Sequence, residues 1–364
     1  MTNKQTNFKY FNSLTGIRAI AAFMVYLHHF NPIPKNYAIH NIVNEMHIGV
    51  TLFFVLSGFL IAYRYLDLNN FSFRNYIINR VARIYPMYFL LTTLTFLPIL
   101  YSNFNNRELL IYGLNISMLR GFFENFKFSG IAQGWSLTVE ETFYFLAPLF
   151  FFFIKRHKIY LVILPLISIL LGIIFVLFFS KIDFYGFFSS FEFMFNYTFF
   201  GRCVEFFIGI SLAVIYKYDL PFFKRFKHYT YAGIIGIIIS LVLLTILKGD
   251  LDFGIRHPMG KIVNTLFLPT FGIFMLYYGL LKERTLISKI LSHKLFILLG
   301  KSSYIFYLIH MGIFVSALGK LGITSTNPFS YLLIFIILNI ISIVMYKYIE
   351  EPLNIYIRRY NASR

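Results

Sequence analysis

Residues 159–179 read IYLVILPLISILLGIIFVLFF and contain no charged side chain. A helix needs about 20 apolar residues to cross a bilayer, so this run is long enough to span one. Similar uncharged runs occupy 229–247, 262–281 and 321–346. The whole chain is 58% hydrophobic and 13% charged, with a mean hydropathy of +0.69. The sequence therefore predicts an all-α, polytopic membrane helix bundle.

Charge distribution predicts how the chain is threaded through the membrane. We expect about ten transmembrane helices, both termini cytoplasmic, and no removable signal peptide. The expected spans lie near 13–31, 47–65, 76–99, 136–154, 159–179, 196–216, 229–247, 262–281, 296–318 and 329–350. This topology places most of the 33 Lys and Arg residues in cytoplasmic segments, as the positive-inside rule requires. Membrane orientation thus explains the +18 net charge, and no nucleic-acid partner is expected.

Two further segments are apolar but are not expected to cross the membrane. Residues 108–119 are too short to cross, so we expect an interfacial or re-entrant helix there. Residues 181–200 are crowded with Phe and should lie in the membrane interface. Cys203 is the single cysteine, which excludes an intramolecular disulfide and favours a small buried residue.

The first expected span carries Arg18 and, eleven residues later, His29. In a helix this spacing returns to nearly the same face, with the two side chains about 16 Å apart along the axis. His28 should point elsewhere. A buried arginine and a titratable histidine on one face indicate function. The alternative is that Arg18 snorkels to the cytoplasmic interface and His29 caps the outer helix end.

Two further constellations have both functional and structural interpretations. Arg80 and Arg83 share a helix face, which suits a phosphate, although a pair of positive-inside anchors would look the same. WSLTVEETFY at 135–144 carries the only Trp and two carboxylates, Glu140 and Glu141. A carboxylate there could orient a histidine or a sugar hydroxyl, or stabilise the first helical turn.

The second half of the chain adds three polar features. Arg202 and Glu205 are three residues apart in an apolar stretch and should neutralise one another. LGKSSYIFYLIH at 299–310 places Tyr307 and His310 on one helix side, at a depth where ionisable groups indicate function. YIEEP at 348–352 reads as a helix end, with its two glutamates bridged to a basic loop.

Together these segments resemble one family, the integral-membrane acyltransferase-3 family, which includes bacterial O-acetyltransferases of surface polysaccharides. The resemblance rests on Arg18 and His29, LFFVLSGFLI at 52–61, Arg80 to Pro86, and the segments at 135–144, 202–209, 299–310 and 348–352. Cys203 and Val204 stand where the family commonly has Leu-Pro. We expect one acyltransferase domain over 1–364, without the appended soluble esterase-like domain of some members.

The resemblance implies a membrane O-acyltransferase, in the first place an O-acetyltransferase, in the cytoplasmic (inner) membrane. No cofactor is bound; acetyl-CoA or another acyl-CoA is the donor, and a glycan or lipid-linked sugar the acceptor. His29 would be the catalytic base, assisted by Arg18 and Glu140, while Arg80 and Arg83 would hold the CoA phosphates. Second-rank candidates near the acceptor or His29 are Glu141, Arg202, Glu205, Tyr307 and His310. No metal site is expected.

We further expect a protein-lined passage from Arg80 and Arg83 to His29, with an acceptor site opening outward beside Glu140. Ser57 lacks the G-x-S-x-G context of a nucleophile and reads better as part of a Ser-Gly helix contact. The alternative function is a transporter or flippase of lipid-linked sugars. Against it, we find no inverted-repeat signature, which transporters often show.

Overall fold

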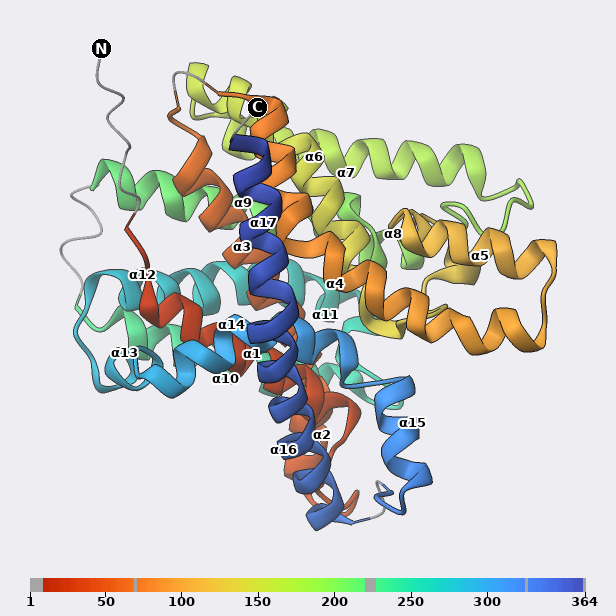
Figure 1. Ribbon diagram of the computed structural model, residues 1–364. Helices are drawn as coiled ribbons and strands as arrows, with labels where there is room; N and C mark the ends of the chain where they lie inside the picture. The colour runs from red at the N-terminus through yellow and green to blue at the C-terminus, as the bar shows by residue number, and fades with distance from the viewer. Residues whose placement is uncertain (1–8, 69–70, 220–226, 325–326, 363–364) are drawn as a thin grey trace.

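The computed structural model describes residues 9–68, 71–219, 227–324 and 327–362. Within these ranges the chain is a bundle of helices without any strand (Figure 1). Eight helical segments of this described part are long and apolar enough to cross a membrane, or up to nine if one bent pair is counted as a span. The prediction of an all-α polytopic membrane protein is therefore confirmed.

The helices follow one another in this order. The first half comprises α1 (Asn12–His29), α2 (Ala38–Asn44), α3 (Gly49–Tyr65), α4 (Phe73–Ser102), α5 (Asn106–Ile116), α6 (Trp135–Arg156), α7 (Tyr160–Phe179), α8 (Phe191–Tyr197) and α9 (Phe199–Tyr218). The second half comprises α10 (Tyr229–Lys248), α11 (Pro258–Ile262), η7 (Val263–Ile273), α12 (Phe274–Lys282), α13 (Leu286–Leu291), α14 (Lys294–Ile309), α15 (Ile313–Lys320), α16 (Pro328–Met345), η8 (Tyr346–Glu350) and α17 (Glu351–Ala362). Short 3₁₀ turns at Glu45–Ile48 (η1), Arg120–Phe122 (η2), Glu124–Phe126 (η3), Ala132–Gly134 (η4) and Gly254–Arg256 (η6) connect some of them.

The expected count of ten spans depends on α1. This helix is not among the eight apolar segments, and it carries Arg18, His28 and His29 in only 18 residues. It nevertheless lies in the interior, with nine buried residues and extensive contacts to α14 and α3. Neighbouring helices, rather than lipid, thus surround most of this polar helix, which is where charged groups at membrane depth are tolerated.

Glycines allow α3 and α9 to pack closely along their length. A Cβ on Gly58 would lie 2.1 Å from the carbonyl oxygen of Phe206, and one on Gly209 would lie 2.1 Å from that of Val55. Small residues at such crossings let helix backbones approach closely in a membrane protein. Gly58 therefore confirms a helix contact at the Ser-Gly pair.

The ninth expected span, 296–318, is broken in the structure. α14 ends at Ile309 and α15 begins at Ile313 after a bend of 77°. Gly312 in this break has a φ of +80°, a conformation that other residues rarely adopt. The break leaves His310 at the C-terminal end of α14, and the chain after His310 changes direction as it enters α15.

The expected helix end at YIEEP is wrong. Helical structure continues from α16 through a π-helical segment, η8, into α17, so Pro352 lies in the first turn of α17. Within this continuous helix the proline removes one backbone hydrogen bond, and the π-helical segment just before it is the kind of local adjustment that accommodates such a loss. This long helix crosses the front of the bundle in the view of Figure 1 and packs against α14 and α4.

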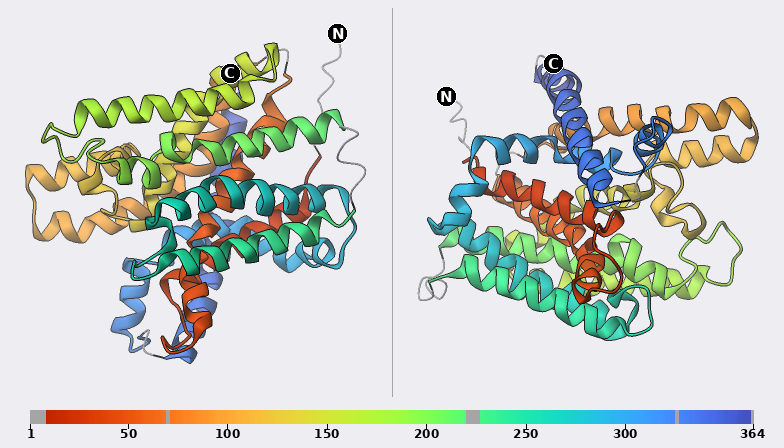
Figure 2. Two further views of the ribbon diagram at one scale, coloured as in Figure 1. Left: turned by 180° about the vertical axis from the view of Figure 1, so that it is seen from behind. Right: turned by 90° about the horizontal axis from the view of Figure 1, so that it is seen from below.

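The two apolar segments outside the expected spans build one end of the bundle. Residues 106–116 form α5, which runs beside α4 as a helical hairpin (Figures 1 and 2). Aromatic side chains of the turn at 120–126 pack against those of 184–188, as in the pair Phe123 and Phe187. Cys203 is fully buried, as expected, with its Sγ 3.6 Å from the carbonyl oxygen of Pro165.

Cys203 offers a probe for the α3–α9 crossing because it is buried and is the only thiol. We expect Gly58→Ala to destabilise the fold by about 1–3 kcal/mol, because the new methyl group collides with backbone of α9. The measurement is thermal unfolding in detergent, followed by a dye that fluoresces on reaction with the exposed thiol. The control is Gly113→Ala on α5, where an added Cβ meets nothing within 4 Å. Equal melting temperatures for both variants would contradict the close crossing.

Candidate functional site

Three cavities follow one another through the bundle. The histidine cavity, of about 500 Å³, is lined by His28, His29 and His47 among others. The central cavity, of about 60 Å³, lies next to it and shares Val50 and Tyr307 with it. The arginine cavity, of about 450 Å³, shares Arg18 and Leu60 with the central one. The shared residues place the central cavity between the two large ones.

His29 stands at the end of α1 and is exposed within the histidine cavity. Its Nδ1 lies 2.9 Å from the carbonyl oxygen of Val25 and 3.2 Å from Nε2 of His310. His310 is fully buried, and its own Nδ1 lies 2.7 Å from the carbonyl oxygen of Tyr307. The break after α14 therefore brings His310 to His29, as the sequence suggested for this second-rank candidate.

These contacts assign the histidine tautomers. A carbonyl oxygen only accepts hydrogen bonds, so Nδ1 of His310 carries the proton that faces Tyr307, and its Nε2 is an acceptor. Both neighbours of His29 Nδ1 are then acceptors, which places the proton of neutral His29 on Nδ1. Its Nε2 keeps a free lone pair, the arrangement that a general base requires.

His28 does not point away from this site, contrary to expectation. It lines the same cavity, and its ring centre is 4.8 Å from that of His29 and 5.5 Å from that of His47. The face argument fails here because the cavity reaches around the end of α1, so adjacent residues both border it. His28 differs in its contacts, since its Nδ1 lies against the carbonyl oxygen of Asn44. His47 was missed, although an ionisable residue ahead of an apolar run is itself a signal.

The rest of the histidine cavity combines aromatic and polar side chains. Trp135 and Tyr197 meet edge to face, with ring centres 5.0 Å apart, and both border the cavity. The other polar side chains of the wall, besides the histidines and tyrosines, are those of Gln133, Glu192, Asn196, Arg202 and Arg256. Flat aromatic rings with a few hydrogen-bonding groups form a typical small-molecule site.

Glu140 lies in the central cavity and not beside His29. Its carboxylate accepts hydrogen bonds from the hydroxyls of Ser57 and Tyr144, and Arg18 borders the same space. Glu140 therefore does not border the cavity that His29 lines, because it lies more than one helical turn beyond Trp135, the residue of α6 that reaches that cavity. Ser57 is likewise a polar group of this cavity rather than part of the helix contact made by Gly58.

Tyr307 borders both the histidine and the central cavity, as Val50 does. Its hydroxyl lies 2.8 Å from Oγ of Ser136 and donates to the carbonyl oxygen of Gln133 at 3.1 Å. The amide of Gln133 returns a hydrogen bond of 2.7 Å to the Tyr307 carbonyl. This reciprocal pairing fixes the ring at the junction of the two cavities.

The arginine cavity collects more positive charge than Arg80 and Arg83 alone. Its cationic lining residues are Lys9, Arg18, Arg64, Arg80, Arg83, Lys301 and Arg358. These residues come from five separate stretches of the chain, so only the fold shows that they converge. The sequence predicted a phosphate-binding role for Arg80 and Arg83, which share one face of α4. It predicted no binding role for Lys9, Arg64, Lys301 or Arg358.

Arg80 and Arg83 differ in their surroundings. Arg83 forms an ion pair of 2.7 Å with Glu350, which is almost completely buried. Arg80 lies over the rings of Tyr65 and Tyr144. The bridge expected between the YIEEP glutamates and a basic loop is thus replaced for Glu350 by a bridge to α4, because α17 continues across the bundle.

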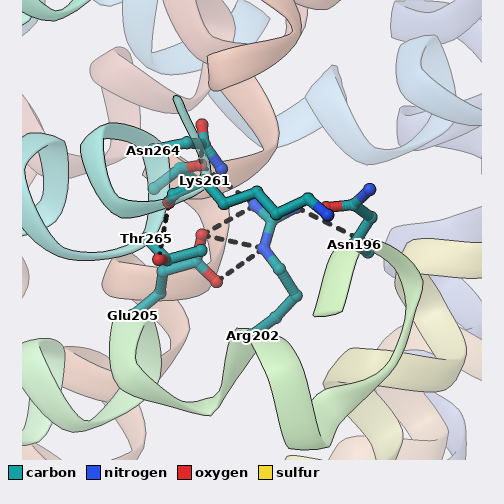
Figure 3. Close-up of polar contacts among 7 residues, drawn as sticks. Asn196, Arg202, Glu205, Lys261, Asn264 and Thr265 are labelled. Carbon is teal, nitrogen blue, oxygen red and sulfur yellow. Dashed lines mark hydrogen bonds and ion pairs between the residues drawn. The ribbon is translucent and has the colours of Figure 1, made fainter. Parts of the chain in front are cut away.

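Arg202 and Glu205 neutralise one another, as expected (Figure 3). The ion pair is 2.6 Å long, and both side chains are buried. Figure 3 shows the Arg202 guanidinium between the Glu205 carboxylate and the backbone of Asn196, to which it donates at 3.3 Å. Arg202 also borders the histidine cavity, whereas Glu205 does not. Glu141, half-buried on α6, borders none of the three cavities.

The model of the acyltransferase-domain family, acyltransferase-3, matches residues 11–347. The chain belongs to this family. The match includes every residue of the three cavities named above except Lys9 and Arg358 at its ends and Glu350 behind Arg83. No solved structure matches the chain.

Two curated relatives show the range of similarity. O-acetyltransferase OatA of Staphylococcus aureus (strain NCTC 8325 / PS 47) is 26% identical over 378 residues, which cover 95% of this chain and 57% of that protein. A Bacillus subtilis (strain 168) protein named "Putative peptidoglycan O-acetyltransferase YrhL" is 31% identical over 169 residues, 41% of this chain and 25% of that protein. The chain thus spans at most 57% of the length of these two relatives.

A pair of variants tests the structural role of the buried ion pair. Arg202→Met should lower the stability by about 3–5 kcal/mol, because it leaves the Glu205 carboxylate buried without its partner. The double variant Arg202→Met, Glu205→Leu should melt close to the wild type, since apolar pairs of similar volume often replace buried ion pairs without loss. Thermal melts with the Cys203 thiol probe compare the three proteins. A double variant as unstable as the single one would show that the pair stabilises the fold by more than mutual neutralisation.

Proposed function

We propose that this protein is an O-acyltransferase of the cytoplasmic membrane that moves an acetyl group from acetyl-CoA to a hydroxyl of a glycan or lipid-linked sugar. The observation that carries the proposal is the series of three cavities. A cationic cavity at one end and a base at the other are separated by a small chamber that both Arg18 and Tyr307 border. Family membership and the O-acetyltransferase names of the relatives support the same chemistry.

The arginine cavity supplies the donor site. CoA carries a diphosphate and a ribose phosphate, and arginine forks bind such oxygens in pairs. Arg80 is the principal candidate, since Arg83 already pairs with Glu350. With the phosphates held there, the pantetheine arm would point past Leu60 into the central cavity, where Nε of Arg18 is buried without a hydrogen-bond partner in the described chain. That N–H could donate to the thioester carbonyl oxygen.

His29 supplies the base on the acceptor side. Its Nε2 would take the proton of the acceptor hydroxyl while the oxygen attacks the thioester carbonyl carbon. The ester C–O bond forms and the C–S bond breaks. The proton is then returned to the departing thiolate, so that CoA leaves as the thiol. His310 positions His29 by accepting from its Nδ1, and Tyr307 holds His310 in turn.

The acceptor would bind in the histidine cavity. Trp135 and Tyr197 present ring surface on which a sugar can lie, with Gln133 and Asn196 available for its hydroxyls. The relatives' names include a peptidoglycan O-acetyltransferase, which makes a cell-wall glycan the first acceptor to test. The transporter alternative is less well supported, because a central cavity of about 60 Å³ would have to widen greatly for a sugar to pass.

Replacement of His29 tests the base. We expect His29→Ala to reduce acyl transfer by ~10²–10⁴-fold, the usual contribution of a general base. The matched control is His28→Ala, since His28 borders the same cavity but has its Nδ1 against the Asn44 carbonyl, whereas the Nδ1 of His29 faces His310. Transfer of labelled acetyl groups from acetyl-CoA to washed cell walls provides the measurement. Equal losses for both variants would remove the special role of His29.

Adjacent arginines on α17 test the donor site. Arg358 borders the arginine cavity, whereas its neighbour Arg359 is exposed and does not. We expect Arg358→Gln to weaken acetyl-CoA binding roughly five- to tenfold, about the value of one phosphate contact of 1–1.5 kcal/mol. Arg359→Gln should leave it unchanged. Calorimetry on the detergent-purified protein measures both, and equal affinities in the two variants would move the phosphates elsewhere.

A further inference from the structure

The central cavity is much smaller than the cavities on either side. Its volume of about 60 Å³ compares with about 500 and 450 Å³ for its neighbours. A water-sized group needs about 10–15 Å³ of such space, so the chamber accommodates roughly four to six non-hydrogen atoms. An acetyl thioester fills it with its sulfur, carbonyl and methyl group. A hexanoyl or succinyl group has more than twice as many atoms beyond the sulfur.

One face of α3 provides much of the wall. Val50, Phe53, Ser57 and Leu60 follow one another at helical spacing and all border the chamber. Ser57 is the polar member and donates to Glu140, so polar groups and the apolar residues occupy different parts of the lining. An acyl chain would therefore extend against the apolar residues, of which Phe53 and Phe54 have the largest side chains. Phe54 is buried with its ring stacked on Phe206, ring centres 4.9 Å apart, whereas Phe53 is half-buried and presents more of its ring to open space.

Phe53 is held in place by Tyr307. Their rings meet edge to face with centres 5.9 Å apart, in a range that favours aromatic pairs. Tyr307 is itself fixed by its hydrogen bonds to Ser136 and Gln133. The Phe53 ring therefore packs against a second ring that is itself held by hydrogen bonds, which limits how far Phe53 can move toward Tyr307.

We propose that the central cavity selects the acyl group by length, and that Phe53 is the residue that sets the limit. This inference rests on the proposed function, because it requires a thioester to enter from the arginine cavity. Packed protein tolerates an added methylene poorly, and one methylene in an apolar pocket changes specificity roughly 10-fold or more. The chamber therefore favours acetyl over butanoyl and excludes hexanoyl and succinyl groups.

The test compares acyl-CoA donors in one assay. Acetyl-, propionyl-, butanoyl-, hexanoyl- and succinyl-CoA are supplied to membranes containing the protein, with washed cell walls as the probe acceptor and CoA thiol release as the readout. We expect kcat/KM for butanoyl-CoA to fall at least tenfold below that for acetyl-CoA in the wild type. Binding affinity should stay constant across the series, because the phosphates are bound elsewhere.

Phe53→Ala should enlarge the chamber and so raise kcat/KM for butanoyl-CoA relative to acetyl-CoA. We expect the ratio of the two kcat/KM values, acetyl over butanoyl, to fall at least tenfold from its wild-type value. The matched control is Phe59→Ala on the same helix, whose fully buried ring packs against Phe11 and Tyr63 and borders none of the three cavities. It should keep the wild-type ratio. Phe53→Leu serves as a milder enlargement if Phe53→Ala does not fold.

The outcomes separate the two proposals. A wild type that neither binds acetyl-CoA nor transfers acetyl groups contradicts the proposed function itself. A wild type that transfers all five acyl groups at similar rates contradicts the length limit while leaving the function intact. A steep length preference that Phe53→Ala and Phe53→Leu leave unchanged overturns the assignment to Phe53.

Discussion

The structure depends on one constraint: polar groups inside an apolar bundle must face one another or a cavity. Arg18 illustrates it. Its guanidinium is located on an interior helix and borders both the arginine and central cavities. Arg202 meets the same requirement with Glu205, and Arg83 meets it with Glu350. These three arginines therefore each lie against a cavity, a carboxylate or both.

The sequence predicted those features that depend on composition or on short spacing. Uncharged runs identified the bundle, and a spacing of three residues identified the Arg202–Glu205 pair, because neighbours on one helix face need no knowledge of the fold. Long-range neighbours could not be predicted in this way. The partner of Glu350 was expected in a loop and is Arg83 on α4, since the helix continues past Pro352. Likewise, Glu140 is tied to Ser57 and Tyr144 instead of His29.

Helix breaks and π segments explain much of what periodicity missed. A regular helix from 296 to 318 would carry His310 through the bundle as one more buried side chain. The bend of 77° instead ends α14 at His310 and gives its imidazole a defined partner in His29. Such breaks are tolerated in a membrane protein where protein or a cavity surrounds the freed backbone groups. In the sequence, only Gly312 indicates the break between α14 and α15, and a single glycine does not predict the directions of the two helices that it separates.

The ion pair between Arg83 and Glu350 gives the arginine cavity two kinds of cation. Arg80 lies over aromatic rings, so an arriving phosphate meets it without displacing a carboxylate. A phosphate that binds Arg83 would have to share the guanidinium with the Glu350 carboxylate, which is almost completely buried, or else break that ion pair. Breaking it would leave that carboxylate uncompensated, which costs several kcal/mol. In the proposed donor site, Arg83 would therefore act mainly by anchoring the end of η8 to α4, which keeps Arg358 of the following helix at the cavity wall. The ion pair would then shape the proposed anion site more than it binds the anion, so two arginines that look equivalent in the sequence have different surroundings in the fold.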